Sequence, residues 1–192
     1  FVSLGGGFGE LKLGRDYTPQ FLNQAFYDPF GASGMATTLT LVGGLGPLGG
    51  GQTIVRASNQ ILYSTPSFGG FGVLLTTYFG ENASNVANSS AGSGSAIRLS
   101  YDAGAISAGL SFANTSTGPG TEVASTSLGG AYNFGVARLM AYVTKDANTG
   151  VAERNGTLVG VTAPFGLSTL RASLSSTEAA GARLQMFAIG FD

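Results

Sequence analysis

The side chains that could do chemistry in this chain of 192 residues are few, and none of them is histidine or cysteine. Ten acidic and nine basic residues give a net charge of −1. The chain therefore lacks the commonest acid–base catalyst, the thiol nucleophile and the commonest nitrogen and sulfur metal ligands. We expect no enzymatic activity and no metal or other cofactor. The lack of a basic field argues against a nucleic-acid partner.

Three arginines lie where their fixed positive charge would attract or repel ions and would not take part in a chemical reaction. Arg98, Arg138 and Arg171 each lie on the polar face of a segment in which apolar and polar residues alternate, within 97–102, 138–146 and 170–175. Successive side chains of a strand point to opposite faces, so these arginines would share the polar side of a sheet. The alternative is the solvated face of a soluble β protein.

The composition favours a sheet in a membrane over a soluble one. Hydrophobic residues make up 43% of the chain and charged residues only 10%, which is little charge for a soluble surface. No apolar run reaches the length of about 18 residues that a membrane helix needs, whereas the alternating segments have roughly the length of a tilted membrane strand. The segments predicted as strands are 2–4, 9–17, 53–64, 70–80, 96–103, 106–115, 123–134, 136–146, 155–164, 167–176 and 182–191.

The predicted connections alternate between short and long. Tight turns are indicated near 102–104, 133–135 and 164–166, and longer polar connections at 82–95, 115–122, 146–155 and 176–181. This alternation is typical of an up-and-down outer-membrane barrel. Segment 18–52 is different, because it is rich in glycine, poor in strand pattern and contains the sequence YDPFG. A loop folded into the lumen of a barrel would account for such a long insertion.

Several short motifs of the N-terminal half resemble one known family. They are Gly7-Phe8-Gly9, Leu13-Gly14-Arg15-Asp16-Tyr17-Thr18-Pro19, Asp28-Pro29-Phe30-Gly31, Asn59 with Tyr63 and Pro66, and Phe68-Gly69-Gly70-Phe71. Their order and spacing are similar to the strand, constriction loop and following hairpin of the trimeric general porins of Gram-negative outer membranes. The region downstream shares only the strand rhythm and the string GARLQMFAIGFD.

The resemblance implies an all-β, transmembrane, antiparallel barrel of about sixteen strands, of which this chain supplies about ten or eleven. We therefore interpret residues 1–192 as a single partial barrel domain, an interior fragment with about four strands before Phe1 and about two after Asp192. Segment 18–52 would be the constriction loop folded into the lumen. The expected partners are two further copies in a homotrimer, the lipid bilayer, and small hydrophilic solutes and ions.

The resemblance also implies which residues line the constriction. In the family an infolded loop carries carboxylates that face arginines on the wall, and Asp28 and Arg56 match those positions. Arg98, Arg138 and Arg171 would add wall charges. For Asp28 the alternative is a structural role in the turn before Pro29, since an Asp-Pro pair favours turn initiation.

Segment 9–17 carries two cations of opposite parity. Lys12 shares a face with Glu10, whereas Arg15 shares a face with Leu11 and Leu13. We expect Lys12 to point into the lumen and Arg15 to lie at the rim or against a neighbouring subunit. A β-bulge between them would reverse this assignment.

The function expected from these observations is passive diffusion of ions and small hydrophilic solutes across the outer membrane, with a mild preference for anions because wall arginines outnumber loop acids. The alternative is a secreted β-rich structural or adhesin-type protein, although no fixed repeat period supports a solenoid. An outer-membrane enzyme barrel is disfavoured by the lack of histidine. A β-sandwich is disfavoured because so few charges remain for its solvent face.

Overall fold

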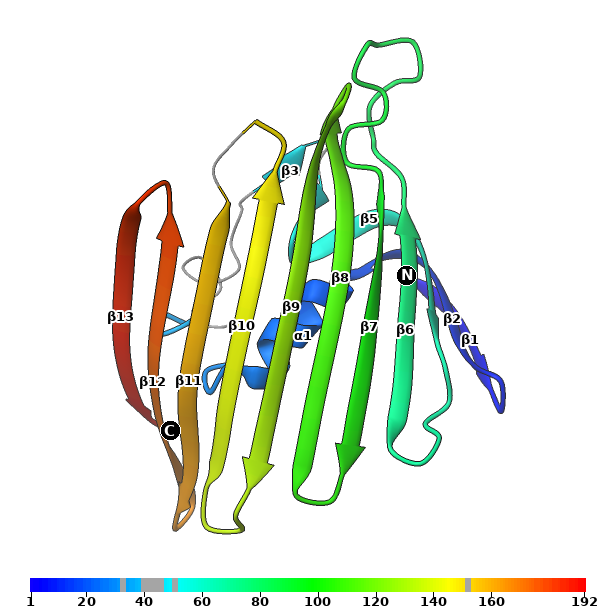
Figure 1. The fold of residues 1–192 in the computed structure, drawn as a ribbon. Helices are drawn as coiled ribbons and strands as arrows, with labels where there is room; N and C mark the ends of the chain where they lie inside the picture. The colour runs from blue at the N-terminus through cyan, green and yellow to red at the C-terminus, as the bar shows by residue number, and fades with distance from the viewer. Residues whose placement is uncertain (32–33, 39–46, 50–51, 151–152) are drawn as a thin grey trace.

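The computed structural model describes residues 1–31, 34–38, 47–49, 52–150 and 153–192. One large antiparallel sheet contains eleven strands, each paired with its neighbour along the chain (Figure 1). The strands are β1 Val2–Gly6, β2 Gly9–Tyr17, β5 Arg56–Ser64, β6 Phe71–Tyr78, β7 Gly94–Ala103, β8 Ile106–Gly118, β9 Thr121–Asn133, β10 Arg138–Asn148, β11 Arg154–Phe165, β12 Ser168–Ala179 and β13 Ala182–Phe191. The predicted all-β antiparallel architecture is confirmed.

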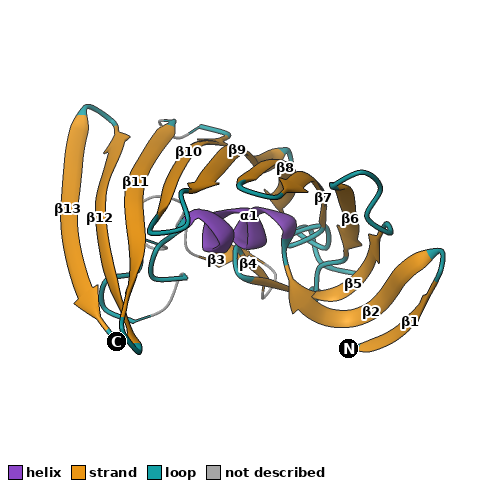
Figure 2. Ribbon diagram, turned by 90° about the horizontal axis from the view of Figure 1, so that it is seen from below, coloured by secondary structure: helices purple, strands orange, loops and turns teal. Residues whose placement is uncertain are grey.

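The sheet is curved, and it encloses the only helix of the described residues, α1 Pro19–Tyr27 (Figure 2). The strands β1 and β13 form the two ends of this arc, and each has one neighbour. A second, two-stranded sheet pairs β3 Pro47–Gly49 with β4 Gln52–Thr53. No helix among the described residues has the length and apolar character required to span a bilayer.

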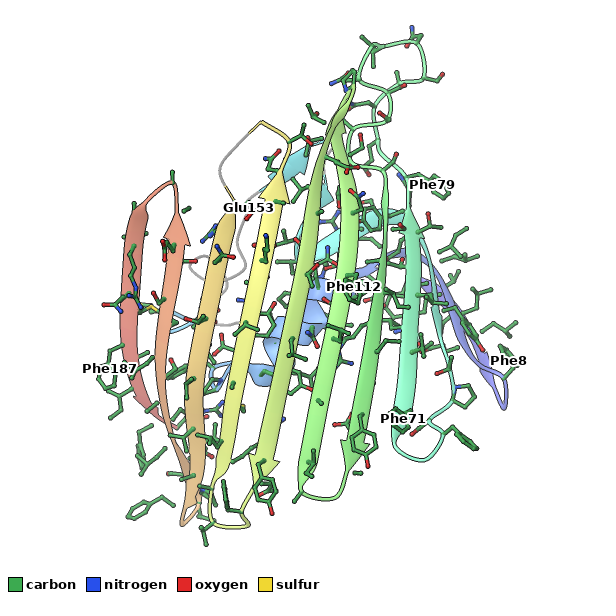
Figure 3. The ribbon with its side chains drawn as sticks, in the orientation of Figure 1. Phe8, Phe71, Phe79, Phe112, Glu153 and Phe187 are labelled. Atoms are coloured by element: carbon green, nitrogen blue, oxygen red, sulfur yellow. The ribbon has the colours of Figure 1, made fainter. Side chains whose placement is uncertain are left out.

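The two faces of the sheet carry different side chains, as the alternation predicts. The convex face presents large apolar residues to the outside, for example Leu99 at 41%, Val143 at 47% and Phe187 at 66% exposure (Figure 3). Alternate positions on the concave face are small, polar or covered by α1. This division matches a barrel wall with lipid outside and water or protein inside.

Aromatic rings mark the ends of some strands on the convex side. Phe71 begins β6 and Phe79 directly follows its last residue, and both are more than half exposed. Figure 3 shows them at opposite ends of this strand. Paired belts of aromatic residues are characteristic of the two interfaces of a membrane.

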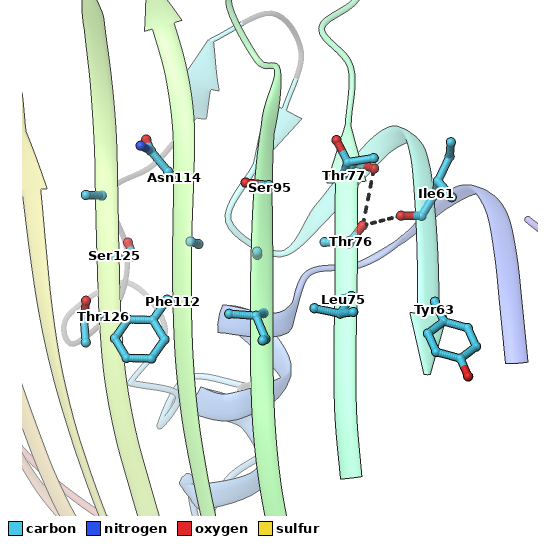
Figure 4. A pocket seen from close by; sticks show the side chains of 14 residues that line it. Ile61, Tyr63, Leu75, Thr76, Thr77, Ser95, Phe112, Asn114, Ser125 and Thr126 are labelled. Carbon is cyan, nitrogen blue, oxygen red and sulfur yellow. Dashed lines mark hydrogen bonds between the residues drawn. The ribbon is translucent and has the colours of Figure 1, made fainter. Parts of the chain in front are cut away.

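A shallow apolar groove runs across the convex face of β5 to β9 (Figure 4). It has a volume of about 730 Å³, and Ile61, Tyr63, Leu75 and Phe112 contribute its larger side chains. A groove of this composition on the outer wall suits contact with hydrocarbon.

The tight turns predicted near 102–104, 133–135 and 164–166 are confirmed, as is the long connection between β6 and β7. Two predicted long loops are wrong. Strand pairing continues to Gly118 and Thr121 in one hairpin and to Ala179 and Ala182 in the other, which leaves two-residue turns. The Ser and Thr residues at the ends of these strands have a composition typical of loops. Backbone pairing in a hairpin does not require apolar side chains, so the strands continue through them. The connection predicted at 146–155 includes residues 151–152, which lie outside the described residues.

The segment 18–52 departs from its predicted irregular character because it begins with the helix α1. Thr18 has extended backbone geometry and its Oγ1 accepts from Phe21 N at 3.3 Å, and Pro19 occupies the first helical turn. Thr followed by Pro is a favourable N-terminal signal for a helix. Residues 32–33, 39–46 and 50–51 of this segment lie outside the described residues.

The predicted strand 53–64 is interrupted at Ile54 and Val55. Val55 O accepts from Thr18 N at 3.1 Å, and Ile54 O accepts from Thr18 Oγ1. These bonds tie both ends of the inserted segment to each other, so the chain rejoins the wall only at Arg56 as β5.

The helix rests on the concave face at positions that have no side chain. Tyr27 is fully buried and packs against Tyr142 and Leu158. A Cβ atom added to Gly129 would lie 2.0 Å from the Tyr27 ring, and one added to Gly109 would lie 2.2 Å from Asn23 Oδ1. The close approach of α1 to the wall therefore depends on these glycines.

The first prediction concerns this close approach. Gly129→Ala places a methyl group inside the Tyr27 ring, so we expect it to lower the free energy of unfolding by about 1–3 kcal/mol through overpacking. The measurement is urea unfolding of the complete gene product refolded in lipid vesicles. The matched control is Gly130→Ala, whose added Cβ would meet nothing closer than Ser107 O at 3.7 Å. Equal stability of the two variants would contradict the close contact between the Tyr27 ring and Gly129.

Candidate functional site

Asp28 lies directly after α1 and its carboxylate is enclosed by its own segment. The residue is 4% exposed. Its Oδ1 accepts from Phe30 N at 2.9 Å, and its Oδ2 accepts from Thr38 N at 3.1 Å and from Thr38 Oγ1 at 2.7 Å. These bonds close the turn that contains Pro29, which is the structural alternative named above. A direct effect of Asp28 on ions stays a prediction.

Arg98 projects from β7 onto α1. It is 8% exposed, its Nε donates to Asn23 Oδ1 at 3.1 Å, and its guanidinium lies 4.7 Å from the centre of the Phe26 ring. Asn23 in turn donates to Ser127 Oγ at 2.9 Å and to Gly109 O at 3.2 Å. One buried asparagine therefore connects the helix to β7, β8 and β9.

Arg138 and Arg171 stand in one row on the concave face. Both pair in register with Thr162 of β11, which lies between them. Arg138 Nη2 donates to Phe26 O at 3.4 Å, and Arg171 Nη1 donates to Pro29 O at 2.8 Å. Both guanidinium groups thus meet backbone carbonyls at the end of α1 and in the turn that follows.

Arg171 also pairs with a carboxylate. Its Nε and Nη2 donate to the two carboxylate oxygens of Asp192, each at 2.9 Å. The hydrogen bonds from Arg171 lower the pKa of Asp192, which lies beyond the last strand. Among the described residues, no carboxylate forms an equivalent two-bond ion pair with Arg138.

One cavity brings together three of the residues predicted from the sequence. It has a volume of about 320 Å³, and Asp28, Arg138 and Arg171 line it with Phe26 and Thr162 among others. Arg98 reaches the same end of α1 through its contact with Phe26. The structure thus places four of the six predicted site residues around the C-terminal end of one helix.

The other two residues lie on the opposite side of α1. Arg56 is exposed, its guanidinium lies 4.4 Å from the centre of the Tyr17 ring, and its Nη2 donates to Tyr17 Oη at 2.7 Å. Lys12 forms ion pairs with Asp16 at 3.1 Å and with Glu10 at 3.7 Å. Its charge is therefore compensated by two carboxylates on its own strand.

Arg15 and Lys12 point to different surroundings. Arg15 is exposed, and its Nη1 donates to Ser58 Oγ at 2.5 Å. The register between β2 and β5 shifts between Gly14 and Asp16. Despite this irregularity, Lys12 and Asp16 remain close enough to pair, so they share a face. The proposed contact of Arg15 with a neighbouring subunit stays a prediction.

The sequence reasoning missed Asn23 and Tyr27, which hold the helix against the wall. Their signal was the Thr18-Pro19 pair, which indicates a helix start and would have placed both residues on one helical face, four residues apart. Within the described residues no group of three or more Asp, Glu, His or Cys side chains could hold a metal ion. The arrangement offers fixed charges and backbone dipoles.

A family model described as Gram-negative porin matches residues 1–192. Outer membrane porin protein 32 of Delftia acidovorans is 34% identical over a match of 172 residues that covers 86% of this chain and 49% of that protein. The structure of the anion-selective porin from Comamonas acidovorans superimposes with a TM-score of 0.88 at 28% identity, covering 99% of this chain and 60% of that one.

A more distant structure shares the fold. Salmonella typhi OmpF, solved in complex with daunomycin, superimposes with a TM-score of 0.73 at 15% identity, and the match covers 94% of this chain and 60% of that one. The chain thus spans about half the length of the curated relative and three fifths of both solved structures. Because the family model covers every residue and the fold agrees, this chain belongs to the Gram-negative porin family.

Proposed function

We propose that this protein forms a water-filled channel through which ions and small hydrophilic solutes diffuse passively across the outer membrane. Membership of the Gram-negative porin family gives the location, the outer membrane. The observation that carries the proposal is the position of α1, which lies on the concave face of a sheet whose convex face is apolar. A segment in that position narrows the lumen while the wall stays in lipid.

We infer a preference for anions from the charges near α1. Arg98, Arg138 and Arg171 gather at one end of the helix. Among the described residues Asp28, Asp102 and Asp192 oppose them there, and Asp28 is held by hydrogen bonds within its own segment. Arg56 adds an exposed guanidinium on the other side of the helix. Fixed charges in a narrow aqueous passage attract ions of opposite sign and repel those of like sign. The similar Comamonas protein is itself named an anion-selective porin.

We assign two different tasks to the residues predicted from the sequence. Arg56 and Arg138 meet passing ions directly, since each has guanidinium area outside the protein interior. Arg171 contributes less, because Asp192 compensates its charge. Asp28 and Arg98 act mainly by fixing the loop, because both are more than nine-tenths buried and hydrogen-bonded within the segment or to α1. Lys12 contributes less field than an unpaired cation because Asp16 and Glu10 neutralise it.

The assembly that we propose is a homotrimer in the bilayer, with Arg15 at the rim or at a subunit contact. A purely structural or adhesive role is not favoured, because the chain belongs to a family of channels. We also propose that the protein has no enzymatic activity.

The channel itself is tested by single-channel recording in a planar bilayer with the complete gene product. We expect large conductance steps that close in groups of three, since the three pores of a trimer would insert together. Absence of conductance from a correctly folded barrel would contradict the proposed function. Steps that occur only singly would contradict the trimer alone.

Selectivity is tested by the reversal potential under a salt gradient. We expect an anion-selective value for the wild type. Arg138→Gln should lower the ratio of anion to cation permeability about sevenfold, since a unit charge about 7 Å away in water favours an anion and disfavours a cation by about 0.6 kcal/mol each. The matched control is Arg183→Gln, which removes an exposed arginine that bonds Ser176 near a hairpin end. A cation-selective wild type, or equal effects of both substitutions, would contradict the assignment.

The positioning role of Arg98 is tested through its partner. Asn23→Ala removes the acceptor of Arg98 and the donor to Ser127, so we expect a loss of about 1–3 kcal/mol in the free energy of unfolding. Asn114→Ala is the control, because Asn114 is an exposed residue of β8 that bonds only to Glu122 among the contacts found. Urea unfolding compares the two variants, and a loss at Asn114 as large as at Asn23 would refute the role.

A further inference from the structure

A second, smaller cavity lies between α1 and the wall, away from the arginines. The side chains around it are Gln20, Phe21, Gln24, Ile54, Ser125, Ser127, Tyr142, Thr144 and Asp146. Phe21 and Ile54 give it an apolar cover, and β9 and β10 form its floor. The ion path proposed above uses none of these residues.

Three polar atoms of the cavity are buried and lack a hydrogen-bond partner within the described part of the chain. They are Asp146 Oδ2, Gln24 Nε2 and Gln20 Oε1. Asp146 is 3% exposed and Gln24 is 2% exposed. The other carboxylate oxygen of Asp146 accepts from Ser125 Oγ at 2.5 Å. A buried carboxylate oxygen and a buried amide without partners are costly, so they indicate a missing bridging group.

The size and chemistry of the cavity define that group. The cavity has a volume of about 10 Å³, and one water needs about 10–15 Å³ of such space and two to four polar partners. Water would accept a hydrogen bond from Gln24 Nε2 and donate one each to Asp146 Oδ2 and Gln20 Oε1. A cation does not fit this set as well, because Gln24 presents a donor.

We propose that this cavity binds one water molecule, and that Asp146 positions α1 through it and so keeps the lumen open. This inference rests on the proposed channel function. Two of the water's partners belong to α1 and the third to β10, so the bridge ties the face of the helix beside Asn23 to the wall. Weakening of the bond to β10 frees that face, and the helix then moves into the lumen more often.

Protonation of Asp146 replaces its charge-assisted hydrogen bond to the water by a weaker neutral one and thereby weakens the bridge. The charged or titratable groups that face Asp146 are Arg154, its register partner on β11, and Tyr142 on β10 itself. From β9, from α1 and from the segment before β5 the neighbours are uncharged: Ser125, Ser127, Gln20, Phe21, Gln24 and Ile54. The closures of the channel should therefore become more frequent as the pH falls, and Asp146 should account for this dependence.

The first test is a high-resolution crystal structure of the complete gene product at neutral pH. We expect one water within hydrogen-bond distance of Asp146, Gln24 and Gln20. A dry cavity, a direct bond between Gln24 and Asp146, or a metal ion in the cavity would overturn the proposed site. This test needs neither a variant nor a conducting channel.

The second test records closure events from about pH 8 to about pH 4, a range that brackets carboxyl titration. Asp146→Asn should show at neutral pH the frequent closures that the wild type shows in acid, and should lose the pH dependence. The control is Glu178→Gln, which removes an exposed carboxylate near the end of β12 and should keep the pH dependence. An Asp146→Asn channel that conducts and titrates like the wild type would overturn the positioning role while leaving the channel function intact.

A double-mutant cycle distinguishes loss of the water bridge from a general loss of stability in the variants. Gln24 and Asp146, both among the described residues, share no direct hydrogen bond. If Gln24→Leu and Asp146→Asn act independently, the double variant should raise the closure frequency by the product of the two single effects. A shared water predicts that the double variant closes less often than the product of the single effects, by about fivefold. Simple multiplication of the two effects would refute the bridge.

Discussion

The close contact between α1 and a row of glycines is the constraint on which the arrangement of the lumen depends. Gly109, Gly129, Gly160 and Gly190 lie on β8, β9, β11 and β13, and a Cβ at any of them would lie within 2.7 Å of Asn23, Tyr27, Pro29 or Phe30. The segment therefore follows a path across the strands where the wall has no side chains. Because each contact is with backbone, the wall fixes the position of the helix to within a methyl group.

This contact explains why the inserted segment can be polar and still ordered. Tyr27 provides a large apolar anchor, packed on Tyr142 and Leu158. Asn23, Arg98, Arg138 and Arg171 add hydrogen bonds to carbonyl, amide and hydroxyl groups. Such bonds are each worth little in water but are expensive to break once buried. The helix is therefore held by several directional hydrogen bonds, and their burial against the wall protects them from competition by the water of the lumen.

The alternation of side chains made the eleven strands predictable, because a period of two is the direct consequence of strand geometry. The ends of two hairpins were missed since their Ser and Thr residues resemble loop composition although their backbones pair. The helix was missed because its nine residues carry the signal of Thr18 and Pro19 only at the start. The arginines were placed on the correct face, but parity alone could not reveal that Arg98 would be covered by Phe26 and Asn23, since that contact joins residues 75 positions apart.

Arginine suits the end of α1 because the side chain there can both bind a backbone carbonyl and carry positive charge toward the lumen. The last carbonyls of a helix carry partial negative charge and have no partner within the helix, so cations are favoured there. Arg138 uses one nitrogen for such a contact, to Phe26 O, and Arg171 uses one for Pro29 O in the turn that follows the helix. A guanidinium has five donors in a rigid plane, so the remaining donors stay directed away from the helix. A lysine in the same position would satisfy the carbonyl with its single nitrogen and turn its charge toward the helix. In Arg171 other donors of the guanidinium bind Asp192. Arg138 can fasten the loop and still present positive charge to an ion beside it.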